Sequence, residues 1–184
     1  MSRKQTVFDE EERRELLRIA RATLELRVRE GKALYIAPPE GKLAKPGAAF
    51  VTLTKKEQLR GCVGCVEAVE PLYKVVQDYV IAAAFDDSRF PPLSADELAL
   101  IKLNISVLSP LFPVRSEEVE VGLHGLLITY RQRRGLLLPH VPVKWGWDRE
   151  TFLDNLCIKA GLQPGDWRRD VELKGFTAEV FGEE

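Results

Sequence analysis

Two strand-like segments joined by a short polar turn restrict the folds open to this chain more than any other feature. Residues 49–54, AFVTLT, alternate apolar and polar side chains, and residues 59–66, LRGCVGCV, follow the turn TKKEQ. Alternation with period two is typical of strands that bury one face, and two such segments close together indicate a β-hairpin. The sequence therefore predicts antiparallel sheet in this part of the chain.

Helical patterns interrupt the strand patterns at irregular intervals. Residues 9–31 carry apolar side chains at helical spacing, residues 71–85 form an apolar stripe that begins at a proline, and another helix begins near Asp148. Further strands are expected within residues 101–110 and in the tail at residues 171–181. Because helices separate hairpins irregularly, we predict an α+β fold with mainly antiparallel or mixed sheets. A doubly wound α/β fold is the weaker alternative.

Length, composition and charge limit the class of protein. A chain of 184 residues fits one domain, or two small lobes that share a core. No apolar run approaches the roughly 18 residues of a membrane span, and the N-terminal segment lacks the apolar region of a signal peptide. Lys and Arg number 27 against 28 Asp and Glu, a net charge of −1, so nucleic-acid binding is disfavoured. The odd count of three cysteines favours reduced thiols and a cytoplasmic location.

The spacing of Cys62 and Cys65 raises the question of a metal or redox site. Residues three apart on a strand point to opposite faces, so the two sulfurs should diverge. The same alternation sorts the neighbours into a core-facing set of Leu59, Gly61, Val63 and Cys65 and an opposite set of Arg60, Cys62 and Gly64. Structural zinc needs four ligands, and only Cys157, His124 and His140 remain, at irregular separations. A redox CxxC begins a helix, whereas this one lies in a strand pattern, so no metal or redox site is predicted.

The polar face of this strand suggests a reactive cysteine. A positive charge at Arg60 would favour the Cys62 thiolate. Glycines within strands often mark the close approach of a ligand or of another backbone, and Gly61 and Gly64 bracket the cysteine. We expect Gly64 to leave open space beside the sulfur. The alternative is that Cys62 is a small buried apolar side chain.

Four segments in order along the chain, LRGCVG, DDSRFPPLS, VGLHGLLI and LLLPHVPVKWGWD, resemble the AMMECR family, also called AmmeMemoRadiSam system protein A. The resemblance covers about residues 20–181 of one unit spanning residues 1–184. It implies a two-lobed α+β fold with a cleft near LRGCVG, and association with Memo-like and radical-SAM proteins, but no known reaction. Cys65 stands where many relatives carry Thr or Ser, which further weakens the CxxC interpretation. The positions that match the family are Arg60, Gly61, Cys62, Gly64, Ser88, Arg89, Phe90, Pro91, Gly122, His124 and Gly125.

Three of the remaining motifs allow two interpretations each. His124, between glycines, is either a catalytic base or ligand, or a histidine that is hydrogen-bonded within a turn. Asp86, Asp87 and Arg89 either bind a cation and an anion, or cap the helix end and form a local Asp–Arg pair. Trp145 and Trp147 either stack on a ring or fill the core before the next helix.

The leading functional hypothesis is a small enzyme, or a component of one, acting on a small or modified substrate by covalent or acid–base chemistry. Cys62 would be the nucleophile, Arg60 its activator or an anion clamp, and His124 the proton carrier. The residues expected to contact the substrate are Arg60, Gly61, Gly64, Ser88 and Arg89. The alternative is a non-catalytic module that binds a ligand or a partner protein, in which Cys62 merely packs. Neither hypothesis requires a cofactor, and a nucleic-acid adaptor is disfavoured by the neutral charge balance.

Overall fold

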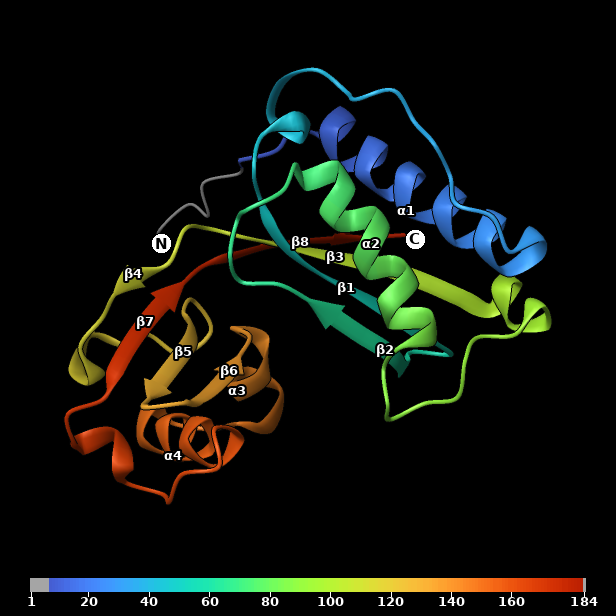
Figure 1. The fold of residues 1–184 in the computed structure, drawn as a ribbon. Helices are drawn as coiled ribbons and strands as arrows, with labels where there is room; N and C mark the ends of the chain where they lie inside the picture. Colours follow the sequence, from blue (N-terminus) through green and yellow to red (C-terminus); the bar gives the residue numbers. More distant parts are fainter. Residues whose placement is uncertain (1–6, 184) are drawn as a thin grey trace. The chain divides into compact units, whose positions relative to one another are not determined.

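The computed structural model describes residues 7–183, which form two compact units (Figure 1). Unit 1 contains the chain up to Leu108 together with the segment from Glu179, and unit 2 is Ser109–Ala178. The chain leaves unit 1 at the end of β3 (Ile101–Leu108) and returns in β8 (Ala178–Gly182), which lies beside β3 in the same sheet. Unit 2 is therefore an insertion between two neighbouring strands of unit 1.

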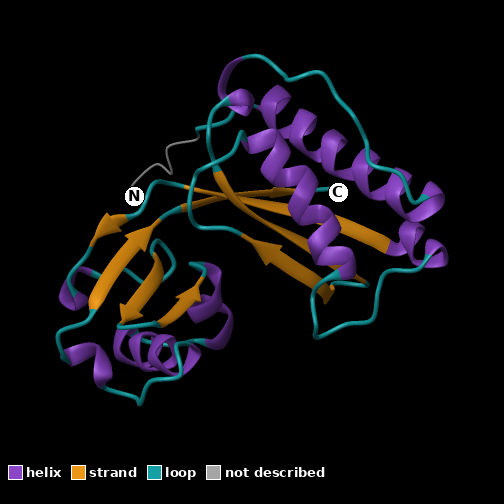
Figure 2. Cartoon of the chain, in the orientation of Figure 1, coloured by secondary structure: helices purple, strands orange, loops and turns teal. Residues whose placement is uncertain are grey.

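Unit 1 is a four-stranded sheet with strand order β2-β1-β3-β8, and β2 lies at one edge. Strand β1 (Ala48–Lys55) pairs antiparallel with β3 and with β2 (Gln58–Gly64), which confirms the predicted hairpin. The helices α1 (Glu10–Glu30) and α2 (Leu72–Phe85) cover one face of this sheet (Figure 2). Their apolar sides meet the buried side of the sheet in one core. The largest fully buried side chains of this core are Leu16, Leu24, Leu53, Leu72, Leu103 and Ile105.

The first helix begins and ends at the expected signals. Asp9 and Glu12 form a capping box, in which Asp9 Oδ1 accepts from the Glu12 N–H at 2.8 Å and Glu12 Oε2 accepts from the Asp9 N–H at 3.0 Å. Gly31 ends the helix in the left-handed region, with φ 67°. Four arginines of this helix form ion pairs: Arg13 with Glu179, Arg14 with Glu10, Arg18 with Glu15 and Arg21 with Glu183.

Unit 2 holds a second antiparallel sheet, with strand order β4-β7-β5-β6. Its strands are β4 (Phe112–Pro113), β5 (Gly125–Tyr130), β6 (Arg133–Leu137) and β7 (Glu172–Phe176), and its helices are α3 (His140–Trp145) and α4 (Arg149–Lys159). Helix α4 contributes Phe152, Leu153 and Leu156 to the core, and all three are fully buried. Two sheets with accompanying helices confirm the α+β class. Short 3₁₀ helices complete the chain at Gly41–Ala44, Ala95–Leu100, Ser116–Glu118 and Asp166–Arg168.

The C-terminal strand pattern divides between the two sheets. Residues 171–181 alternate as one strand in the sequence, but β7 belongs to unit 2 and β8 to unit 1. The break falls at Thr177, whose N–H donates to Ser109 Oγ and whose carbonyl accepts from the Ser109 N–H, both at 2.9 Å. These bonds join the two places where the chain passes from one unit to the other. They take the place of the strand-pairing bonds that a continuous strand would make at Thr177. Within residues 7–183 no helix is both long and apolar enough to cross a membrane.

Candidate functional site

Strand β2 directs Cys62 away from the two helices. Val63 lies opposite Val51, which is fully buried in the core of unit 1, and Val63 packs against that core. Cys62 lies opposite Thr52, and the Thr52 hydroxyl donates a hydrogen bond to Cys62 Sγ at 3.2 Å. Cys65 packs against the same core as Val63. The predicted divergence of Cys62 and Cys65 is therefore confirmed.

A β-bulge lies just before the cysteine. Leu53 pairs with Gly61 while Thr54 pairs with Leu59, so Arg60 is an extra residue in β2. The bulge shifts by one residue the alternation of inward and outward side chains in the part of β2 that precedes it. Leu59 lies in that part and is 42% exposed. The prediction that Leu59 faces the core is therefore wrong, because a one-residue shift moves a side chain to the other face.

The two glycines next to Cys62 allow protein segments to approach each other. A Cβ at Gly61 would overlap the carbonyl oxygen of Ala83 in α2. A Cβ at Gly64 would overlap Phe50 in the neighbouring strand. The expected open space beside the sulfur is therefore absent at Gly64, and this prediction is wrong because Phe50 fills that space. Close packing of backbone explains both glycines.

The loop after α2 binds the outer edge of β2 through Asp87. The Cys62 N–H donates to Asp87 Oδ2 at 2.9 Å, and Arg89 donates from Nε to Oδ1 at 2.9 Å and from Nη2 to Oδ2 at 2.7 Å. Arg89 Nη2 also lies 3.4 Å from the Cys62 carbonyl oxygen. The hydrogen bonds from Arg89 hold the pKa of the nearly buried Asp87 carboxyl far below its usual range. The local ion-pair interpretation is confirmed, and Ser88 between the two charges is exposed.

Arg60 is engaged by a carboxylate of the helix at residues 95–100. Its Nε and Nη2 donate to the two oxygens of Glu97, at 3.0 and 2.8 Å, and Lys55 Nζ donates to Glu97 Oε1 at 2.9 Å. The guanidinium of Arg60 and that of Arg89 both lie near the ring of Phe90, at 5.9 and 5.5 Å from its centroid. Hydrogen bonds from Arg60 hold the pKa of Glu97 far below its usual range. Arg60 thus joins the bulge to the helix at residues 95–100, and its role as activator of Cys62 or anion clamp stays a prediction. The cation that contacts Cys62 in the structure is Arg89.

A polar row crosses the sheet at Cys62. Thr52 of β1 lies between Cys62 of β2 and Asn104 of β3 in the pairing register. The row reaches β8, where a Cβ at Gly182 would overlap the Asn104 amide. Neither Thr52 nor Asn104 was among the predicted site residues. Their signal was polarity at alternating strand positions, but only the strand register places Thr52 opposite Cys62 and Asn104 opposite Thr52.

His124 lies in unit 2, in the turn that precedes β5. Its Nδ1 accepts a hydrogen bond from the Glu120 N–H at 3.1 Å, and its ring packs edge-on against Phe112 with centroids 5.5 Å apart. The hydrogen bond within the turn is therefore present. Because Nδ1 is the acceptor, the neutral ring carries its proton on Nε2. The role of His124 as proton carrier for Cys62 stays a prediction.

The two tryptophans of WGWD have different surroundings. Trp147 packs against the core of unit 2, and Asp148 begins α4 by accepting from the Thr151 N–H at 2.8 Å. Trp145 is 64% exposed, with Lys144 Nζ 5.7 Å from its ring centroid. The core-filling interpretation is confirmed for Trp147 and wrong for Trp145, because α3 ends at Trp145 and directs it outward.

The three cysteines have distinct chemical surroundings. Cys65 lies beside Tyr79 of α2, where burial and the neighbouring sulfur raise the pKa of the phenol. Cys157 is fully buried in α4, and burial raises the pKa of its thiol. Cys62 is half-buried on the polar side of β2. Over residues 7–183, no three His, Cys, Asp or Glu side chains are grouped to hold a metal ion.

We expect Asp87→Asn to lower the free energy of unfolding at pH 7 by about 1–3 kcal/mol, because the Cys62 N–H and Arg89 lose a charged acceptor. The pKa of the Asp87 carboxyl is lower in the folded protein than in the unfolded chain, where it is near 4, so the ionised carboxyl stabilises the fold above about pH 4. This stabilisation is lost as the pH falls through the folded-state pKa. The variant should therefore lose less stability than the wild type on acidification. Urea denaturation at pH 7 and pH 3 measures both effects. Asp86→Asn, at the exposed neighbouring carboxylate, is the matched control, and equal pH dependence of Asp87→Asn and wild type would contradict the assignment.

The geometry defines an α+β protein with a cysteine on the polar face of an edge strand, fixed by an Asp–Arg loop. The AMMECR1 family model matches residues 17–181, so the chain belongs to the AMMECR1 family, as the resemblance predicted. It is 43% identical to a protein of Aeropyrum pernix over 96% of this chain and 80% of that protein, and 40% identical to one of Methanopyrus kandleri over 92% and 87%. The crystal structure of an uncharacterised protein from Pyrococcus horikoshii matches with a TM-score of 0.84 and 38% identity, over 92% of this chain and 90% of that one.

Proposed function

We propose that this protein is a cysteine-dependent enzyme, or a component of one, in which Cys62 is the nucleophile and Arg89 supplies positive charge beside it. The observation that carries the proposal is the hydrogen bond from the Thr52 hydroxyl to the Cys62 sulfur, at a strand edge that Asp87 and Arg89 fix in place. Thiolate is the reactive form of cysteine, and both a donated hydrogen bond and a nearby cation favour it.

The charge on Arg89 is maintained by its neighbours. Its hydrogen bond to Asp87 raises the pKa of the guanidinium, and a negative charge at Cys62 would add to this rise. The same interaction, taken from the side of the sulfur, stabilises a thiolate at Cys62. In the proposed step the thiolate donates an electron pair to an electrophilic atom of a small substrate. The leaving group departs with the electron pair of its own bond, and water or a second substrate then releases the covalent intermediate.

The family resemblance supplies the remaining parts of the proposal. A Memo-like protein and a radical-SAM protein are the predicted partners. The predicted cytoplasmic location agrees with the three cysteines being thiols, because reducing compartments keep them so. We also propose that His124 is the proton carrier in the reaction at Cys62.

Alkylation rates test the nucleophile directly. Under native, reducing conditions, iodoacetamide should label Cys62 roughly tenfold or more faster than Cys65 or Cys157, because thiolate content and access control the rate. Mass spectrometry resolves the three sites within one time course. Arg89→Gln should move the pH dependence of Cys62 labelling to higher pH, because loss of the cation raises the thiol pKa.

Arg29→Gln is the matched control, since it removes an exposed positive charge from α1, on the opposite side of the sheet from Cys62. Its labelling profile should equal that of the wild type. Equally slow labelling of all three cysteines would count against a nucleophile and would favour the non-catalytic binding module.

A further inference from the structure

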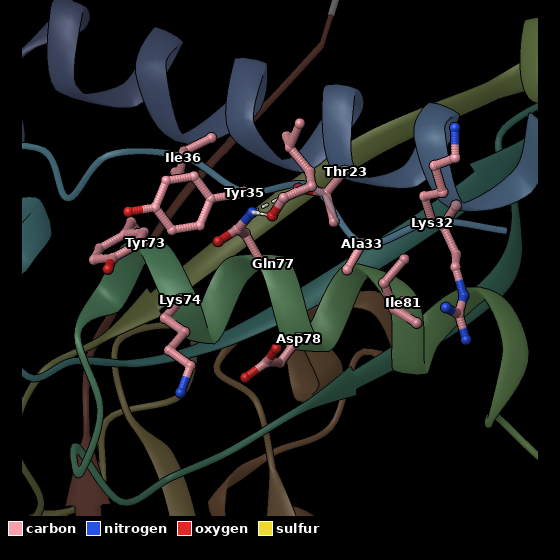
Figure 3. Close-up of a pocket in the computed structure, with 12 residues that line it drawn as sticks. Thr23, Lys32, Ala33, Tyr35, Ile36, Tyr73, Lys74, Gln77, Asp78 and Ile81 are labelled. Carbon is pink, nitrogen blue, oxygen red and sulfur yellow. Dashed lines mark hydrogen bonds between the residues drawn. The ribbon is translucent and has the colours of Figure 1, made fainter. Parts of the chain in front are cut away.

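Unit 1 contains a second candidate site, a pocket of about 500 Å³ between α1, α2 and the segment at residues 32–36 (Figure 3). Gln77 of α2 holds its wall together, because its Nε2 donates to Thr23 Oγ1 of α1 and to the Leu34 carbonyl, both at 3.2 Å. Thr23 is itself buried. The pocket lies among the helices, whereas Cys62 faces away from them. It is therefore a separate site.

One end of the pocket is aromatic. Tyr35 and Tyr73 both line it, and Figure 3 shows them toward the N-terminal end of α2, whereas Lys32 and Ile81 lie toward the other end. Tyr35 is 88% exposed, although most of a tyrosine ring is apolar. Two aromatic rings at the mouth of one pocket offer a stacking surface for a planar ring.

The charged lining favours an anion. The charged side chains that line the pocket are Arg27, Lys32, Lys74 and Asp78. Three positive charges against one negative charge leave an excess of two. Lys32 Nζ lies 2.8 Å from Glu30 Oε2, and Lys74 Nζ lies 3.2 Å from Glu70 Oε1. The side chains in both pairs are about half exposed or more. Such exposed pairs contribute little, so a bound anion can replace the carboxylate partners.

We propose that this pocket binds a small ligand that combines a planar aromatic ring with a phosphate or carboxylate, of about the size of a nucleoside monophosphate. The ring would stack at Tyr35 and Tyr73, and the anion would lie toward Lys32. Asp78 and the Gln77 amide offer hydrogen-bonding groups for polar atoms of the ring. The volume lies within the range of roughly 300–1,000 Å³ that small-molecule sites occupy. The proposal stands apart from the chemistry at Cys62.

Calorimetric titration of the full chain tests the pocket with adenosine monophosphate as the probe. Adenosine, which lacks the anion, and ribose 5-phosphate, which lacks the ring, should each bind roughly tenfold more weakly or worse. Tyr35→Ala should raise the Kd of adenosine monophosphate by roughly tenfold, the scale of one lost stacking contact. Lys32→Gln should raise it severalfold and flatten its salt dependence.

Matched controls separate the pocket from general surface effects. Trp145→Ala removes another exposed aromatic ring and Lys159→Gln another exposed ammonium, both in unit 2, and neither should change the Kd. Tyr35 and Lys32 are exposed, so their variants should melt like the wild type. No measurable binding of adenosine monophosphate at millimolar concentration, or equal losses in Tyr35→Ala and Trp145→Ala, would overturn the proposal.

Discussion

Replacing Glu97 with alanine should lower the free energy of unfolding by about 3–5 kcal/mol, because the change leaves the charge of Arg60 buried without its partner. The side chain of Arg60 is only 10% exposed, and two of its nitrogens donate to Glu97. Among residues 7–183, its remaining Nη1 is buried without a hydrogen-bond partner, so the carboxylate of Glu97 accepts the hydrogen bonds that this guanidinium donates. Urea denaturation at pH 7 measures the loss.

A double variant distinguishes an unpaired buried charge from simple loss of contacts. Arg60→Met combined with Glu97→Leu removes both charges and keeps much of the volume, so it should be more stable than Glu97→Ala alone. Glu10→Ala breaks the exposed pair with Arg14 and should cost no more than about 1 kcal/mol. If Glu97→Ala costs no more than Glu10→Ala, the ion pair has no structural importance.

Local signals made much of the fold predictable. The helix predicted at residues 9–31 is observed as α1, Glu10–Glu30, with Asp9 and Gly31 as its caps, because helix ends are determined by a few neighbouring residues. The hairpin of β1 and β2 was likewise readable, since alternation and a polar turn lie within one short segment. Its turn places Lys56 and Glu57 in the left-handed region, at φ 50° and 64°, without the glycine that usually signals such a turn.

Features that depend on pairing between distant segments were not readable. The bulge at Arg60 exists only relative to β1, so it exposed Leu59 against the prediction from alternation. The tail divided between two sheets because its partners, β3 and β5, lie far away in the sequence. The alternation of polar and apolar residues within one strand indicates neither the bulge nor the division of the tail.

The candidate site shows the same division. Cys62 could be placed on the polar face because it follows the bulge, where simple alternation holds again. Its partners Thr52 and Asp87 come from β1 and from the loop after α2, at 10 and 25 residues from it in the sequence. The interpretation of Asp87 and Arg89 as an ion pair was correct, but its attachment to the backbone of Cys62 required the fold.

Gly61→Ala should be among the most destabilising single substitutions next to the site, by about 3 kcal/mol, because the new Cβ would overlap the Ala83 carbonyl oxygen. That oxygen belongs to the backbone of α2, so the clash is relieved only if the helix and β2 move apart. Gly47→Ala is the control, since a Cβ there would lie 3.0 Å from the Leu72 side chain, whereas a Cβ at Gly61 would overlap the Ala83 oxygen, so a much smaller shift relieves the contact. Thermal melts should show a clearly larger drop in Tm for Gly61→Ala than for Gly47→Ala. Separation of α2 from β2 should also displace Asp87 from the Cys62 N–H, so the alkylation rate of Cys62 should change in the folded variant. An unchanged Tm and an unchanged alkylation rate would together show that Gly61 is not needed for the close approach of helix and strand.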